Sequence, residues 1–579
     1  MSALASSFVD LLAWLTAAPG QPTWLAQHWE AAYFQKDTFD PLMTGLRLFL
    51  TFGGAILLLL EARALRLRIS MSVKWRRWVA ILFTGLAFGV YFDFFNPNTR
   101  YIEYYHRHEF FHYYMGSKYF EEIGYNRLYE CAAAAEMELG RAGVVQRREL
   151  RDLRENLIKK NTDPQIAQYI SECKGIFLKS GGEPRWEEWK REVDWFYRSS
   201  AGSYWENMQK DHGYNPPPVW TMAGKFFGSF GTADDGFFKA LSLIDIALHV
   251  GIVVLLYWAF GWRVGAVCTV WWGCNAPANF YWTGGAFMRQ DWFFFVVAAL
   301  CLAKKRRLAL AGAALTWSAL LRVFPAILFA GWGIMVLFHL FKERAFHPDH
   351  KRLIAGAAVA LAVLVPASML ATGGSGSYKE FIQHTLVTHA RTPLTNQMGL
   401  ETNLVHTEKG RMRFTRDDNL DDPFKPWKEG RNERFKRIKP LFLAIVAFVG
   451  LWTAWALRRT KHLWIGLCLS LPLVMSLTNL TCYYYSMYII APALMVVRPG
   501  FGAVALVVSG ASYVLYKSYY WVDDQFTGIS WLFLLFSGLI LYAYSRPFSV
   551  ARLKAWLANA PEPHAPHAAP TDSSAAAAG

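Results

Sequence analysis

The segment EARALRLRISMSVKWRR, residues 61–77, is strongly basic and joins two apolar runs at 43–62 and 77–95. A helix needs about 20 mainly apolar residues to cross the hydrocarbon core of a bilayer, so each run is long enough to span it. Lys and Arg are concentrated in the cytoplasmic loops of membrane proteins. The segment therefore predicts a cytoplasmic loop between two transmembrane helices.

Further apolar runs repeat this pattern along the chain. Those of about single-span length lie at 239–260, 264–283, 352–371, 439–457, 501–517 and 527–545, and a shorter one lies at 290–303. Two longer tracts, 308–341 and 463–497, would each extend about 50 Å as one helix, at about 1.5 Å per residue. That length is too great for one span across about 30 Å of hydrocarbon and rather short for two.

Loop charge decides how the two long tracts fold. The basic loops beside them are KKRR (304–307), KERAFHPDHKR (342–352) and RRTKH (458–462). All of these loops lie on the cytoplasmic side, together with 61–77, only if each tract is two helices that meet at the opposite face. One kinked helix per tract is the alternative, and it puts at least one basic loop outside.

The sequence therefore predicts an all-α polytopic membrane protein with about 13 transmembrane helices, its N-terminus outside and its C-terminus inside. Its expected parts are an N-terminal periplasmic or interfacial segment (1–42), the first two transmembrane helices (43–95), a large periplasmic loop with helices (96–238), a transmembrane core (239–555) with a second periplasmic loop (372–438), and a disordered cytoplasmic tail (556–579). The run FVDLLAWLTAA (8–18) is too short to span, and whether it enters the membrane stays open.

Composition supports this class and excludes others. The chain has 579 residues, of which 54% are hydrophobic and only 18% are charged; globular domains average about 25% charged residues. The net charge of +16 resides in short loops beside apolar runs, so it indicates no nucleic-acid partner. The seven cysteines form no CxxC pair, which argues against a zinc ribbon or an iron–sulfur site. Cys131 and Cys173 share the oxidising side, where a disulfide and two free thiols both remain open.

The large loop 96–238 contains helical patterns, so we expect a folded unit. RRELRDLRENLIKK (147–160) places Leu150, Leu153 and Leu157 on one helical face. WEEWKREVDWF (186–196) does the same with Trp186, Trp189, Val193 and Phe196. In HGYNPPPVW (212–220), Asn215 is the expected cap of a helix with prolines in its first turn.

The stretch HRHEFFHYYMGSKYF (106–120) concentrates polar chemistry beyond the second apolar run, which ends near Asp93. Its histidines, His106, His108 and His112, are a plausible metal-ligand set, but on a helix only His108 and His112 share a face. The residues alone leave three interpretations open: a metal site, hydrogen bonds to an acceptor or a phosphate, and ordinary interfacial histidines.

Five short elements on the predicted outer side occur in the order found in one enzyme family. They are EFFHYYMGSKYFEEIGYNRLYE (109–130), YNPPP (214–218), GGAFMRQDW (284–292), ALLRVFP (319–325) and NQMGL (396–400). Together they resemble the GT-C-type membrane glycosyltransferases, and more narrowly the bacterial polyprenol-phosphate-mannose-dependent mannosyltransferases. The chain departs from that pattern in Glu109, where the family has Asp, and in Arg322, where it has Lys. The first outer loop is also unusually long, and the helix at 43–62 is extra.

The resemblance implies a hexosyltransferase of the bacterial inner membrane with its active site facing the periplasm. Such an enzyme moves a sugar, which is mannose in the narrower family, from a polyprenyl-phosphate donor to a hydroxyl of a lipid, glycan or protein acceptor, with inversion. A carboxylate takes the proton of that hydroxyl as general base. Glu109 is the first choice for this role, and Asp93 is its rival.

The donor phosphate calls for cations, and the planar fork of arginine matches its oxygens. We therefore expect Arg289 and Arg322 to bind it, and Arg322 is also an ionised group deep in an apolar tract, where such groups usually have a function. The other expected substrate-binding residues are Asp291, His108, His112, His384, His389, Arg391 and Asn396. No residue is assigned to a metal and no cofactor is expected, with a divalent ion left open at the histidines. The alternatives are a lipid or solute transporter or flippase, and a metal-dependent membrane hydrolase built on the histidines.

Overall fold

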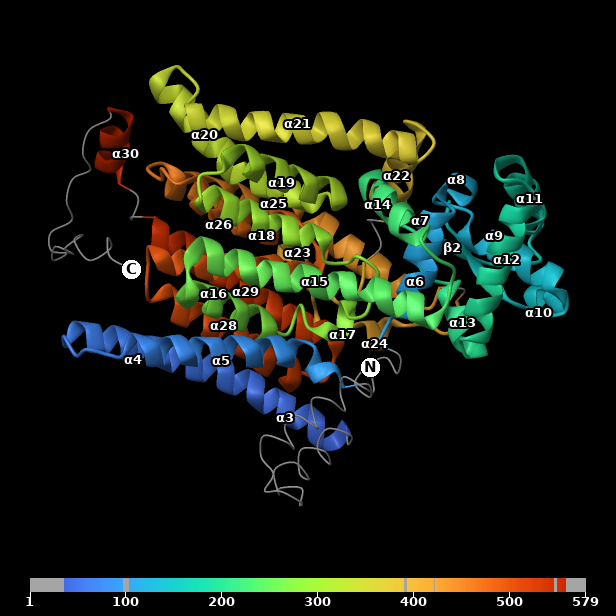
Figure 1. Ribbon diagram of the computed structural model, residues 1–579, viewed down its shortest axis with the longest axis horizontal. Coiled ribbons are helices and arrows are strands. Elements are labelled where there is room, and N and C mark those ends of the chain that lie inside the picture. The colour runs from blue at the N-terminus through green and yellow to red at the C-terminus, as the bar shows by residue number, and fades with distance from the viewer. Residues whose placement is uncertain (1–35, 97–103, 390–392, 421, 546–548, 559–579) are drawn as a thin grey trace.

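The computed structural model describes residues 36–96, 104–389, 393–420, 422–545 and 549–558. These residues are almost entirely helical, and the sheets among them are two short antiparallel ladders: β1 (Glu149–Asp152) with β2 (Leu157–Lys160), and β3 (Gln397–Met398) with β4 (Leu480–Thr481). Figure 1 shows a long helical bundle with a group of shorter helices at one end. The run 8–18 and the tail from residue 559 onward lie outside the described residues.

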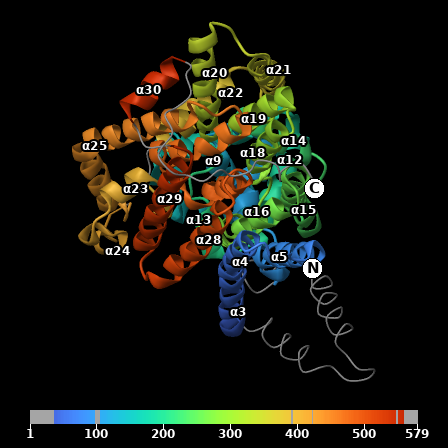
Figure 2. The same cartoon turned by 90° about the vertical axis from the view of Figure 1, so that its left-hand side faces the viewer.

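Most of the bundle helices run along its long axis, as Figures 1 and 2 show from two directions. In chain order the bundle contains α3 (Lys36–Leu48), α4 (Gly54–Arg66), α5 (Val73–Tyr91), α15 (Asp235–Phe260), α16 (Trp262–Cys274), α18 (Asp291–Lys304), α19 (Leu308–Leu321), α20 (Phe329–Glu343), α21 (Pro348–Ala371), α25 (Lys425–Leu457), α26 (Leu463–Leu469), α27 (Leu471–Leu477), the 3-10 helix η8 (Cys482–Val496), α28 (Phe501–Ser518) and α29 (Val522–Tyr544). A π-helical turn, Phe49–Gly53, joins α3 to α4.

Short elements connect and cover the bundle helices. They are the 3-10 turns η2 (Asp93–Phe95), η5 (Phe324–Leu328) and η7 (Glu408–Gly410), the π-helix η6 (Ile382–His389), and the helices α17 (Phe280–Thr283), α22 (Gly376–Phe381), α23 (Leu400–Val405), α24 (Met412–Thr415) and α30 (Val550–Leu557). In Figure 2, α23, α24 and α25 lie on one side of the bundle, and α3, α4 and α5 lie on another.

Seven helical segments among the described residues are long and apolar enough to cross a bilayer. They are Phe39–Arg66, Asp235–Phe260, Phe324–Glu343, Pro348–Ala371, Lys425–Leu457, Phe501–Ser518 and Val522–Tyr544. Other apolar helices are shorter, among them Leu308–Leu321, Leu463–Leu477 and Cys482–Val496. The protein is thus an all-α membrane protein, while helix length alone does not establish the expected count of about 13 spans.

The two long apolar tracts each fold as two helical segments, as loop charge predicted. In the first, α19 ends at Leu321 and Arg322 is extended, with φ −149° and ψ 132°. The ring of Pro325 would clash with the carbonyl of Leu321 four residues earlier, so one helix cannot run through this point. In the second tract, α27 ends at Leu477 and the extended residues of β4 precede η8.

The basic loops gather at the end of the bundle opposite the shorter helices. Arg263 pairs with Glu61 at 2.7 Å, which joins the start of α16 to the end of α4. The Nε1 of Trp556 donates to the carbonyl of Arg458 at 2.8 Å, and its own carbonyl accepts from Lys342 Nζ at 2.9 Å. Figure 1 shows the α4–α5 and α20–α21 turns at this same end. The arrangement agrees with the positive charge of one membrane face.

The shorter helices form what we term the helical cap, residues 104–228. It contains α6 (Arg107–Phe110), the π-helix η3 (Phe111–Met115), α7 (Gly116–Lys118), α8 (Phe120–Ile123), α9 (Leu128–Glu136), the π-helix η4 (Met137–Arg141), α10 (Ala142–Arg147), α11 (Pro164–Ser180), α12 (Gly182–Arg198), α13 (Gly202–Met208) and α14 (Pro218–Gly228). The helix predicted at 186–196 is confirmed, and its Trp186, Trp189, Val193 and Phe196 are fully buried in the cap core.

The helix expected at 147–160 is wrong, because this segment forms the β1–β2 hairpin instead. Leu150 and Leu153 are buried, but Leu157 is 52% exposed, so the three leucines do not share a buried face. The side chain of Asp152 accepts from the backbone N–H of Arg154 at 3.0 Å, and Asn156 adopts a left-handed φ of 60°. Such local side-chain bonds and left-handed residues favour a turn over a helix, and here they outweigh the leucine spacing.

The helix after the proline run, α14, begins at Pro218 with Pro217 as its cap residue. The expectation that Asn215 caps this helix is therefore wrong. Asn215 precedes the cap position, and its Oδ1 accepts a hydrogen bond from the Tyr113 hydroxyl at 2.9 Å. The asparagine thus ties the proline run to η3.

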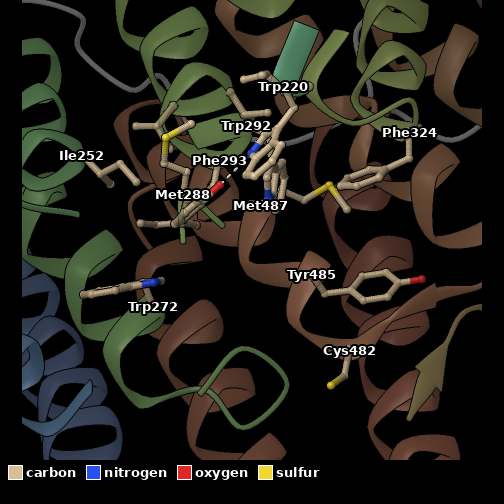
Figure 3. Close-up of a cluster of buried hydrophobic side chains, with 14 of the residues drawn as sticks. Trp220, Ile252, Trp272, Met288, Trp292, Phe293, Phe324, Cys482, Tyr485 and Met487 are labelled. Atoms are coloured by element: carbon tan, nitrogen blue, oxygen red, sulfur yellow. Dashed lines mark hydrogen bonds between the residues drawn. The ribbon is translucent and has the colours of Figure 1, made fainter. Parts of the chain in front are cut away.

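Trp220 of α14 anchors the cap to the bundle. Its Nε1 donates to the carbonyl of Met288 at 3.0 Å, the bond drawn as a dashed line in Figure 3. Buried side chains of the bundle, including Ile252 and Phe293, surround this contact in Figure 3. The loop 284–290, which leads into α18, is therefore held between the cap and the bundle.

A disulfide connects Cys131 of α9 to Cys173 of α11, with a Cα–Cα distance of 5.2 Å. The sequence left open whether these two cysteines form a disulfide or remain free thiols, and the structure contains the disulfide. The remaining five cysteines are free and buried.

Removing this disulfide is expected to destabilise the cap. The bridge closes a loop of 42 residues, and loop-closure entropy assigns such a cross-link about 4 kcal/mol of stability. The Cys131→Ser/Cys173→Ser variant should therefore unfold at lower denaturant concentration when the cap tryptophans are followed by fluorescence. The matched control, Cys482→Ala in the bundle, removes a buried free thiol and should leave the cap transition in place. Equal transitions for the wild type and the double variant would contradict the prediction.

Candidate functional site

Glu109 and Arg289 meet where the helical cap contacts the bundle. Glu109 lies in α6, one helical turn into the cap, and Arg289 lies in the loop 284–290 ahead of α18. Arg289 Nε and Glu109 Oε2 are 3.3 Å apart, and their side chains are 7% and 16% exposed. The structure thus brings together the expected general base and one of the two expected phosphate ligands, far apart in the sequence.

Two tyrosines hold the guanidinium of Arg289. Its Nη1 donates to the hydroxyl of Tyr113, whose ring lies under the guanidinium with its centroid 4.6 Å from Cζ. Its Nη2 donates to the hydroxyl of Tyr483 at 3.1 Å. Tyr113 follows Glu109 by four residues, so the two side chains share one helical face. The planar cation is therefore oriented on three sides: by a carboxylate and by two phenols.

Asp245 in α15 positions the backbone of the arginine loop. Its Oδ2 accepts from the N–H of Arg289 and its Oδ1 from the N–H of Gln290, each at 3.1 Å. Gly285 in the same loop has a φ of +68°, and a Cβ at this position would lie 2.0 Å from the carbonyl oxygen of Tyr104. Only glycine fits such a close approach. The loop is thus locked between α15 and the start of the cap.

Arg322 lies nearby, at the break between the two segments of its tract. Its side chain is buried, and Nη1 donates to the carbonyl of Leu321 at 2.7 Å. Its Nη2 is buried without a hydrogen-bond partner among the described residues. Arg322 interacts electrostatically with Tyr113, Tyr484 and Asp291. A buried donor that lacks a partner costs free energy, so this nitrogen points to a missing acceptor.

Asp291 is the first residue of α18 and lies beside the two arginines. Its Oδ1 accepts from the N–H of Trp292 at 2.7 Å, whereas its Oδ2 is buried without a hydrogen-bond partner among the described residues. Electrostatic attraction from Arg322 and from Arg289 acts on this carboxylate. Asp291 therefore belongs to the same polar cluster, which we term the arginine cluster: Glu109, Tyr113, Arg289, Asp291, Arg322 and Tyr483.

The histidines of α6 and η3 contact the cap instead. His108 Nε2 lies 2.7 Å from Asp211 Oδ2, and His112 Nδ1 lies 2.7 Å from the carbonyl oxygen of His108. His112 Nε2 lies 2.7 Å from the hydroxyl of Tyr129. Burial lowers the pKa of His112 to about 4, so its imidazole is neutral near pH 7. His108 thus contacts Asp211, and His112 Nε2 contacts Tyr129 and also the carbonyl oxygen of Met208 at 3.0 Å, whereas Glu109 contacts Arg289.

Asp93 is paired with a cation of the extra first helix. Its Oδ1 lies 2.7 Å from Arg47 Nη2, and the same nitrogen donates to the carbonyl of Val90 at 2.7 Å. Arg47 Nη1 also donates to the hydroxyl of Tyr513 in α28 at 3.1 Å. These contacts connect α3, α5 and α28. The structure therefore places the rival base in an ion pair that joins three bundle helices.

The expected residues of the second loop have other surroundings. His384 is buried and stacks on Tyr125, with ring centroids 5.5 Å apart. The carbonyl of Asn396 accepts from the N–H of Cys482 at 2.9 Å. Arg391 and the side chain of His389 lie outside the described residues.

Sequence reasoning missed Asp245, Tyr483 and Asp211. Asp245 carried a signal, since it is an acidic residue within an apolar run, where ionisable groups usually have a function. Tyr483 follows the break in the second long tract, among several tyrosines, and nothing in the sequence distinguishes it. Asp211 lies 103 residues from His108, its partner, so no local pattern connects them.

A polar cavity of about 660 Å³ lies between the cap and α22. Its charged lining residues are Glu121, Glu122, Arg127, Arg154 and Glu380. Tyr125, which also lines it, stacks on Tyr214 at 5.7 Å between ring centroids, and Tyr214 lies 6.2 Å from Tyr113. The cavity wall and the arginine cluster are therefore linked by packed tyrosine rings.

Comparison with models of protein families, with curated proteins and with solved structures found no match to this chain.

Proposed function

We propose that the protein is a GT-C-like integral membrane glycosyltransferase that moves a sugar from a polyprenyl-phosphate donor to an acceptor hydroxyl. One observation carries this proposal: a carboxylate, Glu109, lies 3.3 Å from a buried arginine, Arg289, beside a second buried arginine with an unpartnered N–H. A base next to two phosphate-binding cations is the set of groups that this transfer needs.

In the proposed reaction, the acceptor oxygen attacks the anomeric carbon from the face opposite the phosphate. The new bond joins the acceptor oxygen to the sugar, and the bond between the sugar and the phosphate oxygen breaks with inversion. Glu109 takes the proton of the acceptor hydroxyl, and the polyprenyl phosphate leaves with the electron pair of the broken bond. A general base of this kind contributes about 10²–10⁴-fold to the rate.

Arg289 and Arg322 would bind the phosphate and stabilise its charge as the bond breaks. In the absence of donor, Glu109 neutralises Arg289. A bound phosphate would pair with the guanidinium of Arg289 in place of Glu109. The carboxylate of Glu109 could then accept the proton of the acceptor hydroxyl. The unpartnered Nη2 of Arg322 is a donor ready for the same phosphate. The sugar is proposed as mannose on the resemblance alone.

The acceptor would approach from the polar cavity between the cap and α22. Its carboxylates and guanidinium groups can hydrogen-bond the hydroxyls of a sugar, which an apolar cavity cannot do. The packed rings of Tyr125, Tyr214 and Tyr113, which connect the cavity wall to the arginine cluster, support this route.

Transfer can be tested with membranes that contain the protein and a radiolabelled polyprenyl-phosphate mannose. Label should move to an acceptor fraction and should stay on the donor in membranes of a deletion strain. Comparing the glycans, lipids and glycoproteins of that strain with the wild type would identify the acceptor. Movement of intact donor across the bilayer, with no cleavage of the sugar–phosphate bond, would instead assign a flippase.

We further propose a topology of about 13 spans in the bacterial inner membrane, with the cap and the loop 372–438 facing the periplasm. A cysteine at Val144, which is 38% exposed in α10, should react with a membrane-impermeant maleimide in whole cells. A cysteine at Ser70, in the exposed α4–α5 turn, should react only after permeabilisation. The free native cysteines of the described residues are buried and give little background. The reverse pattern would remove the cap from the periplasmic face.

A further inference from the structure

We propose that His108, His112 and Asp211 bind a divalent transition-metal ion of the zinc class. One ring nitrogen of each histidine and one carboxylate oxygen lie within 4.8 Å of one another. Ligands of a tetrahedral zinc ion, with bonds of about 2.0–2.2 Å, lie about 3.4 Å apart. The three atoms are therefore close to the spacing that an ion requires, and small side-chain rotations complete it.

The two histidines belong to one helical surface. His108 and His112 are four residues apart, and their ring centroids are 4.6 Å apart. The chain passes from α6 into the π-helix η3 between them, and π-helical turns occur often at functional sites. Asp211 reaches the same point from the turn after α13, with its Oδ2 2.7 Å from His108 Nε2.

Contacts around His112 resemble those of a metal-binding imidazole. Its Nδ1 faces the carbonyl oxygen of His108 at 2.7 Å, and such a bond normally orients a ligating histidine and leaves Nε2 for the ion. Nε2 faces the hydroxyl of Tyr129 at 2.7 Å and the carbonyl oxygen of Met208 at 3.0 Å, and an ion would replace these two contacts. The Tyr129 hydroxyl also donates to the carbonyl of Asp211 and accepts from the N–H of Gly213. It therefore keeps two hydrogen-bond partners when an ion replaces it at His112 Nε2.

Access and ligand type decide which ion fits. The side chains of His108 and Asp211 are 24% and 46% exposed, so an ion could enter and could keep water at an open position. Two imidazoles and one carboxylate suit zinc, whereas magnesium and calcium prefer oxygen ligands alone. Sequence alone offered His106 as the third ligand, and the fold supplies Asp211 instead.

The ion would fasten the segment that carries the proposed catalytic residues. It would join α6 and η3 to the turn at 209–213. Two residues after this turn, Asn215 accepts a hydrogen bond from the hydroxyl of Tyr113. Glu109 and Tyr113 are each the next residue after a metal ligand. The metal site therefore positions these residues. The proposal of a metal site does not depend on whether the sugar transfer proposed above is correct.

The test measures metal content and stability of the purified full-length protein, independently of activity. After expression with zinc, mass spectrometry should find about one zinc ion per chain, as a single structural site implies. His112→Gln and Asp211→Asn should each reduce this content about tenfold or more. Chelation followed by added zinc should raise the Tm of the wild type but not of Asp211→Asn. The matched control is His106→Gln, which changes the same residue type outside the set and should keep the ion.

Each outcome decides the proposal. Wild-type protein without zinc, and without a Tm response to zinc, would make His112 a core histidine held by Tyr129 and by the Met208 carbonyl. Equal zinc content in Asp211→Asn, or loss of zinc in His106→Gln, would also overturn it. Because the side chain of Asp211 is 46% exposed, its variant should fold, which formation of the Cys131–Cys173 disulfide will verify.

Discussion

Glu109→Gln is expected to lower the turnover of sugar transfer by about 10²–10⁴-fold, the usual contribution of a general base. Glutamine keeps the size and shape of the side chain, but its amide cannot take the proton of the acceptor hydroxyl. Arg289 retains its bonds to the hydroxyls of Tyr113 and Tyr483 in this variant, so the donor site should persist. The measurement is kcat at saturating donor, and KM for the donor should change much less than kcat.

Asp93→Asn is the matched control for this prediction. It makes the same change from carboxylate to amide, but at the partner of Arg47. Removing one member of a buried ion pair leaves the other charge without its partner. The expected result is a lower Tm with turnover near that of the wild type. If Glu109→Gln keeps near-normal turnover while Asp93→Asn loses about 10²-fold or more, the general base is Asp93 and our assignment is wrong.

The second prediction is that Arg322→Lys raises KM for the polyprenyl-phosphate donor by about tenfold to 100-fold. Lysine keeps a positive charge near Asp291 but lacks the planar fork that matches two phosphate oxygens. Loss of one charged hydrogen bond costs about 1.5–3 kcal/mol, which corresponds to this factor in binding. Because the wild-type Nη2 has no hydrogen-bond partner within the described residues, the substitution should leave the Tm nearly unchanged.

Arg458→Lys supplies the control, since it is the same change at the other end of the bundle. It should leave KM for the donor unaltered. Two results would contradict the role of Arg322. One is an unchanged KM in Arg322→Lys. The other is a large fall in Tm, which would make Arg322 an ion-pair partner of Asp291 that stabilises the fold.

Much of the membrane architecture could be predicted because its signals are local. Apolar length identified the helices, and the positive charge of short loops correctly predicted that each long tract folds as two helical segments broken near Arg322 and Thr478. The expected meeting of Glu109 with Arg289 also appears in the structure, at 3.3 Å. That expectation rested on the resemblance, which implies roles for both residues in one active site.

Local patterns failed where several weak preferences competed. The leucine spacing at 147–160 favoured a helix, but Asp152 and Asn156 turn the chain into a hairpin. Asn215 had the residue type of a helix cap, yet the prolines after it move the helix start to Pro218. In both segments the decisive bonds are made by single side chains, which periodicity does not register.

By itself, the sequence determined which segments are apolar, where they end and which loops carry positive charge, since each of these depends on neighbours along the chain. Only the tertiary structure decided which polar groups meet: Asp93 with Arg47, His108 with Asp211, and Arg289 with Tyr483, 194 residues away. The physical reason is that a buried charge requires a partner, but any suitable residue that packing brings within reach can serve. Packing within the bundle and within the cap makes that choice, and no pattern of neighbours along the chain encodes it.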